Sequence, residues 1–571
     1  MRLFEREPRV LLALVGIGLG AQAALAADRY VNPWHPEAAD ASSGPAQRPY
    51  KTLTYAISQL AVGDRLVIAE GVYRETLDLS ASALTRAPQE NLQDAKETVI
   101  EAAAAARVTI KGSDLVTGWE AIEPGLFVQR AWPVNSQQVF VDGTPLLQIG
   151  GTVFSGYPDK ARHVLAKLHR SEGGIWPGRV PGGRAQLVNN SFYYDANASV
   201  LYLKTALASL AGHQVEVSVR PHALIGRNVS HLSVKGIRFE HANTSSVWHT
   251  GAVVLDGDHL LLDHIEVAYA DSAGLDMSGN DNAIVDSSAK FCGQVGMKVK
   301  GDRARLQNNE TSYNNTRGFN KWWEAGGAKF VGGGLRNSEV AGHLAYANNG
   351  DGIWFDWLNR NNKIHHVVSA YNAGFGIHYE ASQSAFIYDN YVFGNKERGI
   401  YLPHSSHSIV TRNLVAGNGL EGIVVIDEGR RDNETGVDLT PRGNRIFANI
   451  VAWNSKPALI LPALRLDNTS DRNLYVTAAL APTFALGWPS LLNPVKSGLP
   501  QWRKATGQDA NSWDRLLPMP ERLARALAGR SLHPDWSNLL QLASESRRAA
   551  NNAEAAMATP DAAAVQPGPA R

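Results

Sequence analysis

The segments Gly352-Ile353-Trp354-Phe355-Asp356 and Gly376-Ile377-His378-Tyr379-Glu380 are two copies of one short pattern. Other copies begin at Gly251, Gly274, Gly296, Gly327, Gly399 and Gly422. Subtracting successive numbers in the series 251, 274, 296, 327, 352, 376, 399, 422 gives spacings of 23, 22, 31, 25, 24, 23 and 23. A repeat of this length, built from short strands without a helical pattern, is typical of a β-solenoid. The spacing of a leucine-rich repeat is absent, so the sequence predicts an all-β, right-handed parallel β-helix.

Two further columns keep step with the glycines. An asparagine lies four residues before the glycine in four coils, at Asn348, Asn372, Asn395 and Asn418. Asparagine tolerates the left-handed turn conformation, and stacked asparagines can bond to one another along an axis, so we expect both at these turns. A second strand of each coil is indicated by an apolar column at Leu261, Ile284, Leu306, Ile364, Ile387 and Val410.

The rest of the chain is expected to surround this coil. Lys51-Thr52-Leu53 predicts the start of a short helix that shields the open end of the solenoid. Alternating runs near Val139 and Val200 break the period and predict an inserted module, and we expect the coils to end after Ile460. The predicted divisions are a signal peptide (1–27), an N-terminal cap with the first coils (28–112), an inserted β-sandwich-like module (113–215), the main parallel β-helix (216–462), a C-terminal cap (463–545) and a disordered tail (546–571).

The N-terminus and the overall composition indicate an exported protein. Arg2, Arg6 and Arg9 precede or begin an apolar run that ends at Ala24-Leu25-Ala26, a pattern typical of a cleaved signal peptide. We therefore expect a periplasmic or secreted protein without a membrane span after cleavage. Cys292 is the only cysteine, which excludes an intramolecular disulfide framework. Lys and Arg number 55 against 54 Asp and Glu, so the charge balance gives no sign of nucleic acid as a partner.

The outward side chains of the repeated segment carry the predicted chemistry. Side chains alternate across a strand, so the apolar second and fourth residues of each segment should face the core, and the third and fifth should face outward. Asp356 and Glu380 are both fifth residues on adjacent coils, which places their backbones roughly 4.8 Å apart. Two carboxyl groups roughly 5–5.5 Å apart serve a retaining glycosidase, one as nucleophile and one as acid/base.

Further polar and aromatic residues are predicted on this face. The third residues include Lys329 and His378, which are candidates for catalysis, and Lys329 should reach Asp356 diagonally. Lys298 and Lys300 form a basic ladder with Lys329 beside the acids. A simple ion pair is the plainer interpretation of Lys329, and a hydrogen-bonding position on the surface is that of His378. The candidates for substrate binding are Trp354, Tyr401, His404, Trp322, Trp323, Lys298 and Lys300.

An acidic segment follows the last strand of this face. Asp427 to Gly443 contains Asp427, Glu428, Asp432, Glu434 and Asp438. We predict a solvated loop, a lid or a Ca²⁺ site there, since Ca²⁺ is bound through carboxylate oxygens. No other cofactor and no other metal site is predicted.

The order of these elements, with the Asp356 and Glu380 segments one coil apart, resembles glycoside hydrolase family 120 over roughly residues 30 to 510. It is also similar to the β-helix hydrolases of family 141. The first family comprises retaining β-xylosidases, and the resemblance implies Asp356 as nucleophile and Glu380 as general acid/base. That pattern has no counterpart of the insertion with Trp322 and Trp323 or of the ladder of Lys298 and Lys300. The resemblance therefore does not imply which sugar is bound.

Three functions follow from the sequence. The first is a glycoside hydrolase that acts on a polysaccharide or oligosaccharide as a monomer. The second is a polysaccharide lyase or C5-epimerase that acts on a uronic-acid-containing exopolysaccharide, with Lys329 or His378 as the base. The third is a carbohydrate-binding β-helix without catalysis.

Overall fold

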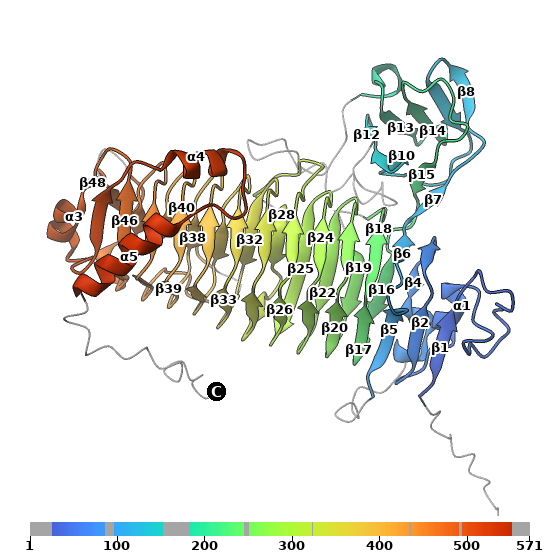
Figure 1. Cartoon of the computed structure of the whole chain (residues 1–571), viewed down its shortest axis with the longest axis horizontal. Coiled ribbons are helices and arrows are strands. Elements are labelled where there is room, and N and C mark those ends of the chain that lie inside the picture. The colour runs from blue at the N-terminus through green and yellow to red at the C-terminus, as the bar shows by residue number, and fades with distance from the viewer. Residues whose placement is uncertain are drawn as a thin grey trace, which may run out of the picture.

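A computed structural model describes residues 26–85, 96–151, 182–244, 251–322, 324–432, 435–489 and 494–550. Three long parallel sheets run along one axis, and each coil of the chain adds one strand to each sheet (Figure 1). Within the described residues, no helix is long and apolar enough to cross a membrane. The expected signal peptide and most of the expected disordered tail lie outside the described residues.

We name the three sheets by position. Sheet A contains β1 (Asp28–Val31), β2 (Arg65–Ile68), β5 (Thr98–Ala102), β17 (Leu232–Lys235), β20 (Leu260–Asp263), β23 (Ala283–Val285), β26 (Arg305–Gln307), β30 (Glu339–Ala341), β33 (Lys363–His365), β36 (Phe386–Tyr388), β39 (Ile409–Thr411), β42 (Arg445–Phe447) and β45 (Thr469–Asp471). Sheet B contains β3 (Gly71–Tyr73), β6 (Val108–Lys111), β18 (Ile237–Glu240), β21 (Glu266–Ala268), β24 (Ser288–Lys290), β27 (Glu310–Ser312), β31 (Leu344–Tyr346), β34 (Val368–Ala370), β37 (Tyr391–Phe393), β40 (Leu414–Ala416), β43 (Ile450–Ala452), β46 (Leu474–Thr477) and β49 (Trp513–Leu516).

Sheet C contains the repeated glycine segments. Its strands are β4 (Leu77–Asp78), β16 (Leu224–Arg227), β19 (Gly251–Asp256), β22 (Ala273–Ser278), β25 (Val295–Asp302), β28 (Gly326–Phe330), β32 (Asp351–Asp356), β35 (Ile377–Glu380), β38 (Ile400–Pro403), β41 (Ile423–Ile426), β44 (Leu459–Leu461), β47 (Thr483–Leu486) and the antiparallel β48 (Lys496–Ser497), with β29 (Leu335–Arg336) paired to the end of β25.

The alternation of side chains on sheet C is as predicted. Ile353, Phe355, Ile377 and Tyr379, the second and fourth residues of their segments, lie fully buried in the main core between the three sheets. The third and fifth residues therefore lie on the outer surface of sheet C. Two predicted alignments are wrong by one residue. Ala252, not Gly251, aligns with Gly274. The inward residue of β20 is Leu262 and not the predicted Leu261, because Leu262 pairs with Ile284.

The asparagine column forms a buried ladder. The side-chain amide of Asn372 donates to Oδ1 of Asn395 at 2.9 Å and accepts from the Asn348 amide at 2.9 Å. The left-handed conformation predicted for these asparagines is wrong, because the residue before each one adopts it, as at Ala347 and Tyr371. A Cβ on Gly352 would lie 2.8 Å from the Asn372 Nδ2 atom, so the glycine and asparagine columns keep step for a steric reason.

The coils continue beyond the predicted limit near residue 462. Strands β45, β46 and β47 extend all three sheets in parallel register. Asn468 and Asn473 continue the asparagine bonds there, while the glycine column has ended, so the glycine pattern alone misses this coil. The end is closed by α3 (Leu499–Thr506), in which Trp502 is fully buried and stacks on Phe484.

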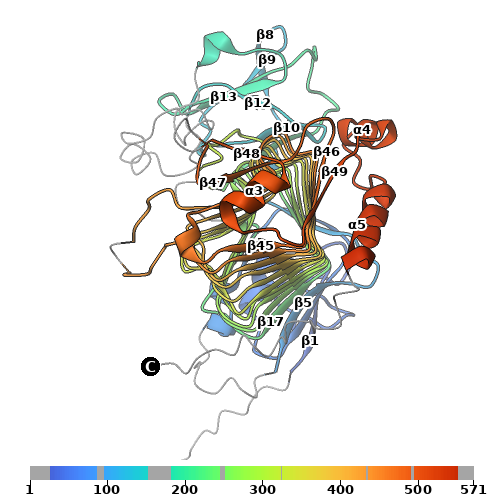
Figure 2. The same cartoon turned by 90° about the vertical axis from the view of Figure 1, so that its left-hand side faces the viewer.

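Helices cover parts of the solenoid. At the start, Thr52 caps α1 (Leu53–Ser58) by accepting from the Tyr55 amide, and α1 packs into the main core. At the other end, α4 (Glu521–Ala528) and α5 (Ser537–Ala550) pack on the outside of sheet B (Figure 2). Since α5 is helical to Ala550, the disorder predicted from residue 546 does not begin there.

A separate module is inserted into the first coils. One of its sheets contains β7 (Ser113–Leu115), β10 (Val139–Val141), β11 (Thr144–Pro145) and β15 (Val215–Ser218), and the other contains β8 (Glu120–Glu123), β9 (Leu126–Gln129), β12 (Leu147–Gln148), β13 (Ser191–Asp195) and β14 (Val200–Lys204). The solenoid strands that flank the module are β6 and β16; β6 pairs directly with β18, and β16 pairs directly with β4, so the coils stack without a gap at the insertion. The module stands beside the N-terminal part of the solenoid (Figure 1).

Candidate active site

Asp356 and Glu380 are aligned on neighbouring strands of sheet C. Asp356 ends β32 and Glu380 ends β35, and the two residues are register partners. Parallel strands lie roughly 4.8 Å apart, so the two carboxyl groups leave the backbone one strand spacing from each other. Their side chains are 16% and 17% exposed. The placement of both acids on one outer face is therefore as predicted.

Lys329 joins Asp356 to the indole of Trp354. Its ammonium lies 3.0 Å from Oδ2 of Asp356 and 3.3 Å from the centre of the Trp354 ring. The diagonal contact between Lys329 and Asp356 is the one predicted. A cation over an indole face is favourable, and more so when the pair is shielded from water.

The faces of the Trp354 ring are occupied by protein. Lys329 on the preceding coil covers one face, and the imidazole of His378 on the next coil stacks at 4.8 Å and 12°. Trp354 is 5% exposed. The prediction that this ring stacks on a sugar is therefore wrong. Its free edge instead donates from Nε1 to Oε2 of Glu380 at 3.0 Å.

Glu380 has two further partners. Nε2 of His378 lies 3.5 Å from Oε2 of Glu380, and the guanidinium of Arg430 lies 2.5 Å from Oε1. Arg430 comes from the segment that follows β41, and its guanidinium also covers the Trp357 ring at 4.6 Å. Sequence reasoning missed Arg430, because no pattern in the chain aligns this segment with Glu380.

His378 is held by a buried acid that sequence reasoning also missed. Nδ1 of His378 lies 2.9 Å from Oδ2 of Asp351, while Oδ1 of Asp351 accepts from the Phe375 amide at 2.9 Å. Asp351 and His378 are 4% exposed. Asp351 immediately precedes a repeat glycine, a position that holds a carboxylate in few coils, and that was the available signal.

Tyr401 and His404 bind the acidic segment. The Tyr401 ring is buried beside His378, and its hydroxyl donates to Oε1 of Glu428 at 2.7 Å. His404 and the Tyr401 hydroxyl lower the pKa of Glu428, while burial and Glu428 raise that of Tyr401. The prediction that Tyr401 holds a sugar ring is wrong, because the ring is 5% exposed.

The other acids of this segment do not converge in the described residues. Asp427 pairs with Arg431, Asp438 pairs with Arg442, and Asp432 accepts from the Thr435 amide. Glu434 lies outside the described residues. Across the described part of the chain, the three potential metal ligands that come together are Asp263, His264 and Asp286, at the turns after β20 and β23. The Ca²⁺ site remains a prediction.

Trp322 borders the same region. Its ring lies 5.6 Å from that of Phe375, which in turn contacts the rings of His378 and Tyr401. Trp322 is 49% exposed, so its surface is open to a ligand. Trp323 lies outside the described residues. The insertion before β28 therefore brings one exposed aromatic side chain to the edge of the candidate active site.

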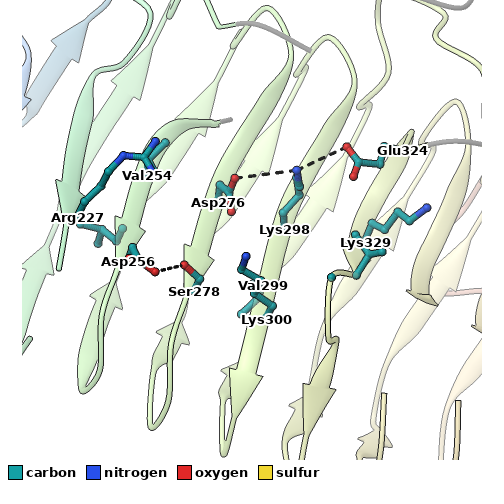
Figure 3. A pocket seen from close by; sticks show the side chains of 13 residues that line it. Arg227, Val254, Asp256, Asp276, Ser278, Lys298, Val299, Lys300, Glu324 and Lys329 are labelled. Carbon is teal, nitrogen blue, oxygen red and sulfur yellow. Dashed lines mark hydrogen bonds and ion pairs between the residues drawn. The ribbon is translucent and has the colours of Figure 1, made fainter. Parts of the chain in front are cut away.

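A groove of about 500 Å³ lies along the preceding strands of sheet C (Figure 3). It is lined by strands β16 to β28 of sheet C, and Lys329 is part of its wall. Lys298 lies within the groove, 4.0 Å from Oδ2 of Asp276 and 3.5 Å from Oε2 of Glu324 (Figure 3). Burial raises the pKa of Asp276 despite the nearby lysines. Lys300 is exposed on the same strand as Lys298.

Comparisons with known proteins agree with this fold. A family model described as a right-handed β-helix region matches residues 222–415 and 321–457. A solved structure titled as the complex of XylC with xylose has a TM-score of 0.50 and 14% identity, covering 79% of this chain and 83% of that one. Another solved structure, titled glycoside hydrolase, has a TM-score of 0.50 and 13% identity, and the match covers 79% of this chain and 96% of that one. No curated protein matches the sequence. The protein is thus a right-handed parallel β-helix.

Proposed function

We propose that this protein is an exported carbohydrate-active enzyme, a glycoside hydrolase that cleaves a polysaccharide or oligosaccharide with retention of configuration. The observation that carries the proposal is the register pairing of Asp356 with Glu380, both part-exposed on one outer face. A separation near one strand spacing is close to the roughly 5–5.5 Å between the carboxyl groups of retaining enzymes. The two similar structures, one named for xylose and one for glycoside hydrolysis, give the proposal further support.

In the first step, a carboxylate oxygen of Asp356 attacks the anomeric carbon. The bond from that carbon to the leaving oxygen breaks, and Glu380 gives its proton to this oxygen. In the second step, Glu380 takes a proton from water, the water oxygen attacks the anomeric carbon, and the bond to Asp356 breaks. Asp356 and Glu380 are therefore the two catalytic residues of the proposal.

The neighbouring side chains position these two acids. Lys329 holds Asp356 through its ion pair, and Trp354 donates to one oxygen of Glu380, with Nε2 of His378 3.5 Å from the same oxygen. Arg430 holds the other oxygen and is 38% exposed. Because Arg430 is the most exposed partner of Glu380, we propose that the substrate displaces it when the leaving group approaches. Trp322 offers an open ring for a sugar face.

The proposal is tested with purified mature protein and a panel of neutral and acidic polysaccharides. Reducing ends are measured together with absorbance near the ultraviolet edge, where the double bond formed by a lyase absorbs. The configuration of the first product, followed by NMR, decides between retention and inversion. Reducing ends without a double bond, with retained configuration, are the expected result. Inverted products would contradict the assignment of Asp356 as nucleophile.

A uronate lyase or epimerase is the second candidate. The observation that favours it is the position of Lys329, which is 5% exposed, lines the groove and pairs with Asp356. A lysine shielded from water can act as a base. In that case products would contain a double bond, or would differ only in configuration at C5, and substitution of Lys329 would abolish the reaction.

A further inference from the structure

The groove upstream of the acids contains two parallel rows of outward side chains. One row consists of Asp276, Lys298 and Lys329, which are successive register partners on β22, β25 and β28. The other row consists of Arg227, Asp256, Ser278 and Lys300, which are successive register partners on β16, β19, β22 and β25. Both rows run along the axis of the solenoid toward Asp356. A ligand that follows the groove therefore approaches the candidate active site.

The interior of the groove holds three carboxylates and one lysine that is shared between two of them. Lys298 lies between the carboxylates of Asp276 and Glu324, while Asp256 accepts from the Ser278 hydroxyl. Lys329 pairs with Asp356 outside the groove. Three carboxylates against one lysine give this interior a net negative charge, so its side chains offer hydrogen bonds to hydroxyl groups, and any attraction for an anion must come from cations elsewhere in the groove.

The two ends of the second row differ from its interior. Arg227 and Lys300 are both exposed, and within the described residues neither has a carboxylate within 4.0 Å. They stand three strand spacings apart, roughly 14 Å, on the same side of the groove. A linear chain that lies in the groove would pass both cations. Arginine binds carboxylates through two parallel hydrogen bonds, and lysine binds them as a point charge.

We propose that the groove binds the substrate segment next to the cleaved bond, and that Arg227 and Lys300 select a glycan whose sugars carry carboxylate groups. This inference rests on the proposed function, because the groove gains its role from the acids beside it. The substrate class is therefore an acidic, uronate-containing chain. The basic pair acts in binding and takes no part in bond cleavage.

The test is an equilibrium binding measurement by calorimetry. The protein carries Asp356→Asn to prevent turnover, and the ligands are hexamers of galacturonate, glucuronate and mannuronate with their carboxyl-reduced, neutral counterparts. At least one acidic hexamer should bind about tenfold or more tightly than its neutral counterpart, and this difference should shrink as salt is added. Adding Arg227→Gln and Lys300→Gln should remove this difference in affinity. The affinity for the neutral hexamer should stay within about twofold of that of Asp356→Asn alone.

A matched control is Lys363→Gln, which removes an exposed lysine of β33 on sheet A, away from the groove. Its affinity for the acidic hexamer should equal that of the parent. Equal affinity for acidic and neutral hexamers, unchanged affinity in the double variant, or no binding of any acidic hexamer would overturn the inference. Selective binding by a wild-type protein that cleaves none of the ligands would contradict the hydrolase and leave the groove assignment intact. Cleavage of neutral chains alone would support the hydrolase and contradict the groove assignment.

Discussion

Nδ1 of His378 lies 2.9 Å from Oδ2 of Asp351, and Nε2 of the same ring lies 3.5 Å from Oε2 of Glu380. The imidazole therefore connects a buried acid to the part-exposed acid of the candidate active site. A hydrogen bond at one ring nitrogen fixes the orientation of the ring and decides which nitrogen carries the proton. Asp351 therefore orients the imidazole that lies beside Glu380.

Asp351→Asn should lower kcat by about tenfold to a hundredfold, with little change in KM, because loss of orientation at a catalytic group carries a cost of this size. Steady-state kinetics on the glycan found in the polysaccharide screen measure the effect. The asparagine keeps an oxygen for the Phe375 amide, so the urea midpoint should stay close to that of the parent. Unchanged kcat would show that His378 does not act through Asp351.

Asp356→Asn should reduce hydrolysis at least about a thousandfold, because removal of a nucleophile eliminates the covalent step. The rate of release of reducing ends is the measurement. Asp389→Asn is the matched control, since Asp389 is a carboxylate that pairs with Arg412 on a different sheet. Full activity in Asp356→Asn would exclude the two-acid mechanism.

Glu380→Gln should reduce kcat by about 10²–10⁴-fold on natural glycans. The loss should be smaller on aryl glycosides with good leaving groups, because they need less protonation. Azide should restore turnover of the aryl glycoside and yield a glycosyl azide of retained configuration, since azide attacks without a general base. An unrestored variant would indicate that Glu380 has another role.

The alternation of side chains and the Gly–Asn spacing made most of sheet C predictable. Gly352 and Asn372 are linked by a steric contact, so the two columns appear together in the sequence. The register of Asp356 with Glu380 followed directly from that spacing. The alignment of the first repeated segment, at β19, was wrong by one residue. Ala252 occupies the glycine position there, so Gly251 does not mark it.

The surroundings of the candidate site were less predictable. The outward direction of Trp354 and Tyr401 was correct, but their burial depends on Lys329, His378 and a segment from beyond β41. Such contacts join residues that share no period, so no local pattern indicates them. Arg430 is the clearest case, since it reaches Glu380 from a non-repeating segment.

Asn372→Ala should lower the free energy of unfolding by about 2–4 kcal/mol, because it removes the acceptor of the buried backbone and side-chain N–H groups of Asn348 and one of the two donors to Oδ1 of Asn395. Urea unfolding followed by circular dichroism measures the change. Asn349→Ala, next in the chain to the ladder residue Asn348, removes only a 3.4 Å bond from an exposed residue and should have little effect. Equal stability of the two variants would mean that the ladder contributes nothing.

Asp271 should make stability fall with rising pH. Burial raises the pKa of Asp271 from 3.8 to about 7, although Arg317 lies 3.3 Å away. The folded chain therefore holds this proton more tightly than the unfolded chain, so the associated stability is complete below pH 4 and is lost as pH rises through 7. Between pH 4 and pH 7 this loss amounts to up to roughly 4 kcal/mol in the free energy of unfolding, and Asp271→Asn should abolish it.

Urea midpoints from pH 4 to pH 8 test this slope by the difference between parent and Asp271→Asn. Asp281→Asn is the contrasting control, since a hydrogen bond from Arg303 lowers the pKa of Asp281. Removal of Asp281 should therefore lower stability at neutral pH rather than raise it. Parallel curves for the parent and Asp271→Asn would contradict the assignment.

The direct pairing of β6 with β18 means that the stacked coils close beneath the inserted module as if it were absent. The module can therefore be lengthened, exchanged or deleted without a change in the register of the coils. The register of Asp356 with Glu380 belongs to later coils, so a change in the module leaves the alignment of these two residues as it is.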